Sequence, residues 1–293
     1  RSEQTEIDEG RGIGSDKQGI YLDLRHLGRE KILTVLPQVR EIAIDFTGTD
    51  PIDDPVPIQP TAHYSMGGIP TTADGQVIAD AQGKPLTGFF AAGEVACVSV
   101  HGANRLGSNS LLEASVFGRR AGSAIAQFIQ DGAELYPISG NPAQQNREII
   151  QKHLDQEGPE LFDEIAQELK ETMTMKCGIF RDEAKLQEAL VSIGELKERL
   201  KTAKIMDKSR RFNTDLLAGL ETEHLVDFSE VVVAGALART ESRGAHSRTD
   251  FPERDDEDWL KHTVAHKKED GPQFSYKGVN IDWDRFPPQK RQY

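Results

Sequence analysis

A glycine-rich stretch near the middle of the chain carries the side chains that are best suited to chemistry. It runs from His101 to Glu113 and reads HGANRLGSNSLLE. The guanidinium of Arg105 can bind a carboxylate through two parallel hydrogen bonds, and the flanking glycines let backbone approach a ligand closely. An ion pair between Arg105 and an internal Asp or Glu is the alternative, and both interpretations stay open at this point. The stretch predicts a loop that holds an anion.

Ser110 and Leu111 follow in the same stretch, at the expected start of a helix from Asn109 to Gln130. Amides in the first turn of a helix have no partner within it, and the positive end of the helix dipole lies there. Such amides suit an anion or the electron-rich edge of a cofactor ring. An ordinary N-cap at Asn109 or Ser110 is the alternative.

Two polar residues upstream are further candidates for binding. Glu94 follows an apolar run that predicts a short buried strand at 88–92. A carboxylate at the carboxyl end of such a strand lies where α/β sheets bind ligands, and it could accept a hydrogen bond from a ribose or ribityl hydroxyl. A helix cap or a salt bridge is the alternative for Glu94. His63 precedes a Gly-Gly turn and could donate to a substrate carboxylate, although a satisfied core histidine is commoner, and His101 has the same ambiguity.

Two other residues invite a functional interpretation but are expected to be structural. Arg11 lies in a Gly-Arg-Gly turn, and His246 lies in the segment ESRGAH, where we expect a hydrogen-bond network between domains. The sequence contains neither a phosphate-binding P-loop nor the pattern Gly-x-Gly-x-x-Gly. It therefore has no complete dinucleotide phosphate site of its own.

Composition narrows the classes of function. The chain has 293 residues and a formal net charge of −13, which makes nucleic acid an improbable partner. Its two cysteines argue against a disulfide scaffold and against a CxxC metal site, so no metal is predicted and a reducing compartment fits best. No run of 18 apolar residues occurs, which argues against a transmembrane helix.

The elements that must position these residues can be placed from sequence patterns. Alternation predicts a strand at 19–24, and helical spacing interrupted by Pro37 predicts two short helices within 29–44. A strand, a glycine turn and a second strand are expected over 61–71. The helix at 109–130 is expected to bury one side, which carries Leu112, Ser115, Val116, Ala121, Ala124, Ile125 and Phe128. Helical spacing dominates 143–240, with a last helix at about 223–239, and 241–293 suggest a small module with a few strands.

Four stretches together resemble one family. TAHYSMGGIPT, AAGE, HGANRLGSNSLLE and ARTESRGAH occur in the order and form of the flavoprotein subunit of succinate dehydrogenase and fumarate reductase. The resemblance covers nearly the whole chain. L-Aspartate oxidase shares the HGANR loop and the ESRG segment but usually lacks the form MGGIPT after the histidine, so that family ranks second.

The resemblance implies an α/β (α+β) fold of the FAD-dependent oxidoreductase type. Residues 1–58 would be the end of a capping domain and 59–138 the returning part of an FAD-binding domain. Residues 139–240 would be a helical domain, and 241–293 a small C-terminal module.

The resemblance also implies roles. His63 and Arg105 would bind the carboxylates of succinate or fumarate, Glu94 would bind the ribityl or ribose region of FAD, and the amides of Ser110 and Leu111 would contact the isoalloxazine ring. Hydride would pass between a substrate carbon and flavin N5. The intact protein would pass electrons to an iron–sulfur subunit and then to quinone. It would lie peripherally, through membrane-anchor subunits, on the cytoplasmic side of the inner membrane or facing the mitochondrial matrix.

Several features of the family have no counterpart in this sequence: the glycine-rich FAD fingerprint, the histidine that carries covalent FAD and the proton-shuttling arginine. We therefore assign no catalytic acid–base residue here and expect the C-terminal half of such a subunit. Alone, it is expected neither to hold FAD firmly nor to turn over succinate. A truncated product that only binds a partner is a further alternative, and the direction of the reaction is not indicated.

Overall fold

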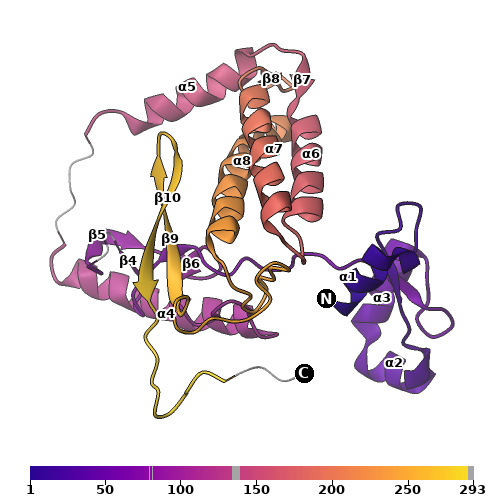
Figure 1. The fold of residues 1–293 in the computed structure, drawn as a ribbon. Helices are drawn as coiled ribbons and strands as arrows, with labels where there is room; N and C mark the ends of the chain where they lie inside the picture. Colours follow the sequence, from indigo (N-terminus) through magenta and orange to yellow (C-terminus); the bar gives the residue numbers. More distant parts are fainter. Residues whose placement is uncertain (79, 81, 134–138, 290–293) are drawn as a thin grey trace. The chain divides into compact units, whose positions relative to one another are not determined.

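The computed structural model describes residues 1–78, 80, 82–133 and 139–289, and the chain divides into two compact units, 1–64 and 65–293. The ribbon in Figure 1 follows the chain through both. The domain boundary that we expected between 138 and 139 touches 134–138 and therefore lies outside the described residues.

The first unit is built from short helices and one pair of strands. Its two strands run antiparallel, with Ile20 opposite Ile58. Pro37 opens α3 because its missing N–H would be unpaired in a first turn anyway, so the predicted break between two helices is confirmed. In order the elements are α1 Ser2–Glu6, the π-helical turn η1 Ile7–Arg11, β1 Ile20–Leu22, the 3-10 turn η2 Arg25–Leu27, α2 Arg29–Val35, α3 Pro37–Thr47 and β2 Val56–Ile58.

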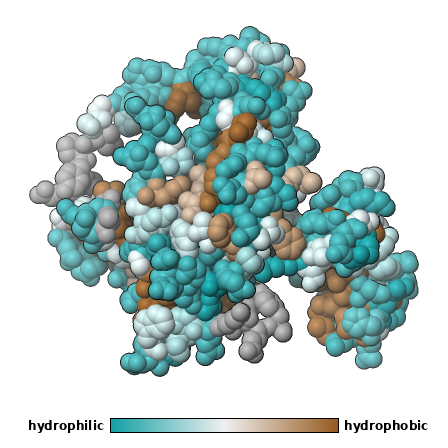
Figure 2. All heavy atoms as spheres, viewed as in Figure 1, coloured by the Kyte–Doolittle hydropathy of each residue, from teal (hydrophilic) through white to brown (hydrophobic). Residues whose placement is uncertain are grey.

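Apolar side chains remain at the surface of this unit, as Figure 2 shows in brown. Phe46 near the end of α3 is 85% exposed, and Val35 and Ile42 are also exposed. The buried residues of α2 and α3 are Ile32 and Ala43. The interior of this unit is therefore small.

The second unit begins with two separate pairs of strands. β3 (Ile69–Pro70) runs parallel to β6 (Ala96–Cys97), and β4 (Gln76–Ile78) runs antiparallel to β5 (Pro85–Phe90). The strand expected before the glycine turn in 61–71 does not form, and only β3 follows the turn. Gly67 and Gly68, with φ of 113° and 124°, make the expected turn.

The prediction of a buried strand at 88–92 is wrong about burial. A strand is present as β5, but its residues are exposed up to Phe89, and only Phe90 is half-buried. Phe90 packs edge-on against Phe128, with ring centroids 6.2 Å apart. Because β5 pairs with β4 alone among the described strands, its apolar residues have little to pack against.

The predicted long helix is confirmed as α4, Asn109–Gln130, and its buried side was predicted correctly only in part. Ala121 is buried as predicted, but Leu112 and Val116 are 60% and 51% exposed, and the buried Glu113 was not predicted. Ala121 is buried because the hairpin turn approaches α4 at Gly75, where an added Cβ would lie 2.6 Å from the Cβ of Ala121.

The helical region is confirmed and supplies the main core. Figure 1 shows α6, α7 and α8 packed side by side, and the helices are α5 Pro142–Asp155, α6 Phe162–Lys176, α7 Glu183–Leu200 and α8 Thr214–Ala238. Their buried side chains include Ile165, Leu186, Ile193, Leu196, Val226 and Val233. A short parallel pair, β7 Glu160–Leu161 and β8 Ala203–Lys204, joins the loops at one end.

Helix α8 begins nine residues before the start predicted at 223. The side chain of Asn213 accepts a hydrogen bond from the amide of Leu216 at 2.6 Å, which caps the helix at its true start. This cap extends α8 through Leu216, Gly219 and Thr222, of which the last two are buried.

The C-terminal region forms an antiparallel hairpin of β9 Lys261–Lys268 and β10 Gly271–Gly278. Strands were predicted in this region. Trp259 precedes it and packs edge-on against Tyr276, with ring centroids 5.6 Å apart. No helix in the described part of the chain has the length and apolar character that a bilayer crossing requires.

Candidate functional site

The glycine-rich loop, residues 101–108, lies between β6 and α4, and a polar pair joins its first residue to α4. Nε2 of His101 lies 3.4 Å from Oε2 of Glu113, with side chains 11% and 2% exposed. His101 opens the loop, and Glu113 lies in the second turn of α4. The pair therefore ties the entrance of the loop to the helix that follows it.

Arg105 lies half-buried within this loop, four residues before α4. Its Nη1 donates to the carbonyl oxygen of Leu106 at 3.0 Å. A guanidinium has five N–H donors in a planar fork, and this bond helps to orient the side chain. At this position in the loop, Arg105 is suited to bind a carboxylate.

The helix start differs from both expected caps. Ser108 is the N-cap, with φ of +66° and no side-chain cap hydrogen bond, so neither Asn109 nor Ser110 takes that place. The amide of Leu111 donates to the carbonyl of Ser108 at 3.2 Å, and it is therefore engaged in the first turn. The side chain of Leu111 is 75% exposed. Ser110 stays the better candidate of the two for donating an amide to a ligand.

Glu94 lies in the turn between β5 and β6 and is exposed. Its Oε1 accepts a hydrogen bond from the amide of Ser65 at 3.1 Å. The residue before it faces α4, because a Cβ added to Gly93 would lie 3.9 Å from the Cβ of Ala114. Glu94 thus lies near the first turns of α4.

Backbone packing fixes the segment that leads into this turn. The amide of Ile69 donates to the carbonyl of Val95 at 2.9 Å. A Cβ on Gly68 would lie 2.4 Å from that same carbonyl oxygen, so glycine is required for the approach.

The predicted site residues are divided between the two units. Glu94, Arg105, Ser110 and Leu111 belong to the second unit, whereas His63 is an exposed residue near the end of the first. The substrate and cofactor roles expected for these five residues stay predictions.

Contacts from the C-terminal region are the feature that sequence reasoning missed. The amide of Ala245 donates to the carbonyl of Ala103 at 2.9 Å, and the Oγ of Ser99 lies 2.7 Å from Nε2 of His262. Each contact joins two residues that are more than 140 positions apart in the sequence. Ala103 lies in the glycine-rich loop, and Ser99 lies just before it. The glycine in ESRGAH was the available signal, because an isolated glycine often marks a close backbone approach.

The hydrogen bonds expected around His246 are present, and that they join two domains stays a prediction. Its Nδ1 lies 3.1 Å from Nη1 of Arg181, and its Nε2 lies 3.2 Å from the carbonyl oxygen of Arg239. Burial lowers the pKa of His246 to about 4. A neutral ring then accepts from Arg181 at Nδ1 and donates from Nε2, which fixes its tautomer.

Arg11 is structural, as expected. Its guanidinium pairs with the carboxylates of Glu6 and Glu9 in the first unit. The pairing closes the turn around Gly10, whose φ is +82°.

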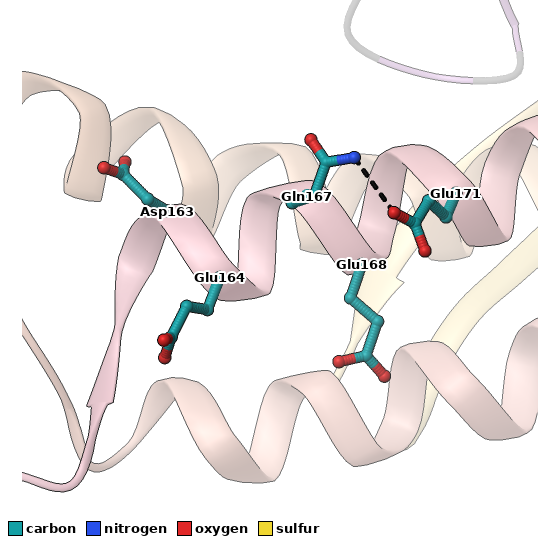
Figure 3. Close-up of a pocket in the computed structure, with 5 residues that line it drawn as sticks. All are labelled: Asp163, Glu164, Gln167, Glu168 and Glu171. Carbon is teal, nitrogen blue, oxygen red and sulfur yellow. Dashed lines mark hydrogen bonds between the residues drawn. The ribbon is translucent and has the colours of Figure 1, made fainter. Parts of the chain in front are cut away.

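A hollow on the outer face of α6 lies apart from this loop and carries different chemistry. Figure 3 shows its lining residues, Asp163, Glu164, Gln167, Glu168 and Glu171. Gln167 donates to Glu171 at 3.0 Å, and Arg199 pairs with Glu168. Within the described ranges no group of three or more His, Cys, Asp or Glu side chains could hold a metal ion. The hollow is an acidic, solvated helix face.

Family comparisons cover most of the chain. A family described as "FAD binding domain" matches residues 1–111, and a family described as "Fumarate reductase flavoprotein C-term" matches residues 166–293. The first match includes Glu94, Arg105 and the start of α4, and it identifies FAD as the cofactor of this fold.

Curated relatives agree with these matches. The chain is 42% identical to the succinate dehydrogenase flavoprotein subunit of Coxiella burnetii, over 99% of this chain and 50% of that protein. It is 43% identical to the fumarate reductase flavoprotein subunit of Mycobacterium tuberculosis, over 94% of this chain and 47% of the relative. The chain thus spans about half the length of the curated relatives it matches.

A solved structure shares the fold. An E. coli quinol fumarate reductase chain superposes with a TM-score of 0.86 at 39% identity, covering 98% of this chain and 48% of that one. A Mycobacterium smegmatis Sdh1 chain superposes with a TM-score of 0.79 at 30% identity, covering 96% of this chain and 46% of that one. The expected fold class, a flavoprotein fold with mixed helices and strands, is confirmed.

Proposed function

The chain belongs to the family of succinate dehydrogenase and fumarate reductase flavoprotein subunits, and we propose that the protein interconverts succinate and fumarate with FAD. The observation that carries the proposal is the glycine-rich loop. It presents Arg105 four residues before the first residue of α4, so a carboxylate-binding group and a helix N-terminus share one element. When bound, FAD supplies a group that can accept a hydride or return it.

The chemistry of the residues present fits FAD. The carboxylate of Glu94 can accept hydrogen bonds from ribityl or ribose hydroxyls, and its bond from Ser65 keeps that side chain in place. The amides at the start of α4, Ser110 foremost, can donate to the ring. The positive end of the α4 dipole favours negative charge on the reduced ring. Leu111 offers an exposed apolar side chain beside these amides.

His63 and Arg105 are proposed to bind the two carboxylates of the substrate. Arg105 suits one carboxylate because a guanidinium forms a fork of two donors. A histidine can donate a single hydrogen bond to the other. We propose no acid–base residue within this chain, and its residues bind and orient the substrate rather than move the proton.

Electrons are proposed to pass to an iron–sulfur subunit and then to quinone, with membrane-anchor subunits holding the assembly at a membrane. The names of the relatives support this, because one solved relative is a quinol fumarate reductase. A peripheral position is consistent with the described helices, none of which could cross a bilayer. We further propose that 1–58 end a capping domain, 59–138 complete an FAD-binding domain, 139–240 are a helical domain and 241–293 are a C-terminal module.

The test compares substrates on the full-length protein. Purified protein is assayed with succinate and with L-aspartate, using an artificial electron acceptor, and turnover of succinate but not of L-aspartate is expected. Oxidation of L-aspartate alone would instead favour an L-aspartate oxidase. Co-purification with an iron–sulfur protein without any flavin would favour a non-catalytic module that only binds its partner.

A further inference from the structure

A turn in the C-terminal region lies directly against the glycine-rich loop. We call residues 241–248 the support turn. Within it, Gly244 has φ of +59°, and the next amide, that of Ala245, donates to the carbonyl of Ala103 at 2.9 Å. A Cβ added to Gly244 would lie 2.5 Å from that carbonyl oxygen and 2.6 Å from its carbon. These atoms are backbone, so a side chain at 244 would force the loop itself to move.

Ion pairs and hydrogen bonds of Glu241 and Arg248 hold the support turn in place. Glu241 is fully buried and accepts hydrogen bonds from Arg239 at 2.5 Å and from Arg243 at 2.8 Å. Arg248 is 1% exposed, pairs with Asp250 at 2.7 Å and donates to carbonyls at the end of α8. Because Glu241 and Arg248 are buried and paired, we expect the turn to keep its place and the loop to move instead.

A second contact reaches the entrance of the loop from the hairpin. Ser99 has φ of +74°, which is uncommon for a residue other than glycine. Its Oγ lies 2.7 Å from Nε2 of His262 in β9. Such a conformation persists where the surroundings hold it. The C-terminal region thus holds the chain at Ser99 and at Ala103, on either side of His101.

We propose that Gly244 is a positioning residue for substrate binding: the support turn fixes Ala103 and thereby sets the direction of Arg105, two residues further along. The proposal rests on the proposed function, since Arg105 is taken to bind a substrate carboxylate. Gly244 itself contacts no substrate. Two parallel hydrogen bonds to a carboxylate demand a defined orientation of the guanidinium, so a small shift of the loop weakens binding strongly.

The first test uses the full-length protein and needs no measurement of activity. Trypsin cleaves after arginine, and the Arg105–Leu106 bond reports how firmly the loop is held. Gly244→Ala is expected to raise the rate of cleavage at this bond about tenfold, whereas Gly132→Ala is expected to leave it unchanged. Gly132 is the matched control, because its φ is +80° and an added Cβ would meet nothing within 4 Å. Equal rates in Gly244→Ala and wild type would overturn the proposal.

A second variant tests the same proposal in case Gly244→Ala does not fold. Ser99→Gly removes the hydroxyl that contacts His262 and introduces the residue that favours a positive φ, so no atom is forced into the fold. It is expected to raise cleavage at Arg105–Leu106 while the helical circular dichroism signal stays at the wild-type level. Unchanged cleavage in Ser99→Gly would contradict the hold that the C-terminal region is proposed to exert.

The third test uses the full-length protein. Gly244→Ala is expected to raise the KM for succinate about tenfold, with the flavin absorbance spectrum and kcat close to wild type. A loss of kcat at unchanged KM would point to a general loss of folded enzyme and would overturn the positioning role. If wild-type protein does not turn over succinate, the proposed function fails, while the trypsin result still reports whether the support turn holds the loop.

Discussion

Nε2 of His101 and Oε2 of Glu113 lie 3.4 Å apart, with 11% and 2% of their side chains exposed. The pair joins the first residue of the loop to α4, and the support turn contacts the loop at Ala103. Along the chain, Arg105 therefore lies between Ala103 and Glu113, which are both held by contacts.

Replacing Glu113 with Ala is expected to lower the free energy of unfolding by about 1–3 kcal/mol, because a buried polar neighbour loses its partner. Urea unfolding followed by circular dichroism measures this. Glu195→Ala, at an exposed position of α7, is the control and should change the value by less than about 0.5 kcal/mol. A similar small change in Glu113→Ala would contradict a structural role for the pair.

Replacing Arg248 with Leu is expected to lower the free energy of unfolding by about 3–5 kcal/mol, since the last carbonyls of α8 lose this donor and Asp250 keeps the amide of Glu183 but loses its ion pair. Arg248→Lys keeps the charge but not the fork of donors, so an intermediate loss is expected. Thermal unfolding of both variants checks the order. A lysine variant as stable as wild type would show that the fork is not needed.

Stability is expected to fall in mildly acidic solution because of His246. Burial lowers the pKa of this histidine from 6.5 to about 4 in the folded protein. The unfolded chain therefore binds a proton between these pH values and the folded protein does not, so stability is complete above pH 6.5 and is lost as pH falls toward 4.

The effect of His246 is at most about 3 kcal/mol. Unfolding free energies of wild type and His246→Asn measured at pH 7.5, 6 and 5 test it, with the pH 7.5 pair as the reference. The difference between the two proteins should shrink as pH falls. A difference that is constant across this range would refute the assignment.

Purified alone, this chain is expected to show no flavin absorbance bands in the visible range. The glycine-rich phosphate pattern does not occur in its sequence, so Glu94 and the start of α4 would have to hold FAD without that phosphate-binding loop. An absorbance spectrum after gel filtration in the presence of FAD measures this, with free flavin in the column buffer as the blank. Bands that co-elute with the protein would contradict the expectation.

Much of the local structure follows from sequence patterns. The break at Pro37, the helix at 109–130 and the helical region around Ile193 all depend on periodicity and turn chemistry, which act within a few residues. The start of α8 was missed because the capping role of Asn213 lies outside the apolar pattern.

The site was harder to predict because its support is not local. Whether Leu112 and Val116 are exposed depends on which residues pack against α4. Helical spacing alone does not predict those residues. The contact between Gly244 and Ala103 joins residues 141 positions apart, and no pattern within either segment specifies its partner. The residue types in the loop indicated binding chemistry, and the tertiary fold supplied the positioning.

The central claim is that Arg105 binds a substrate carboxylate, and the most direct test is steady-state kinetics of Arg105→Gln in the full-length protein with succinate. Arg119→Gln, at an exposed position of α4, is the matched control. The expected result is a fall in kcat/KM of at least about 100-fold, which corresponds to about 2.7 kcal/mol, with unchanged flavin content and a control like wild type. A kcat/KM for succinate within about threefold of wild type in Arg105→Gln would contradict the claim.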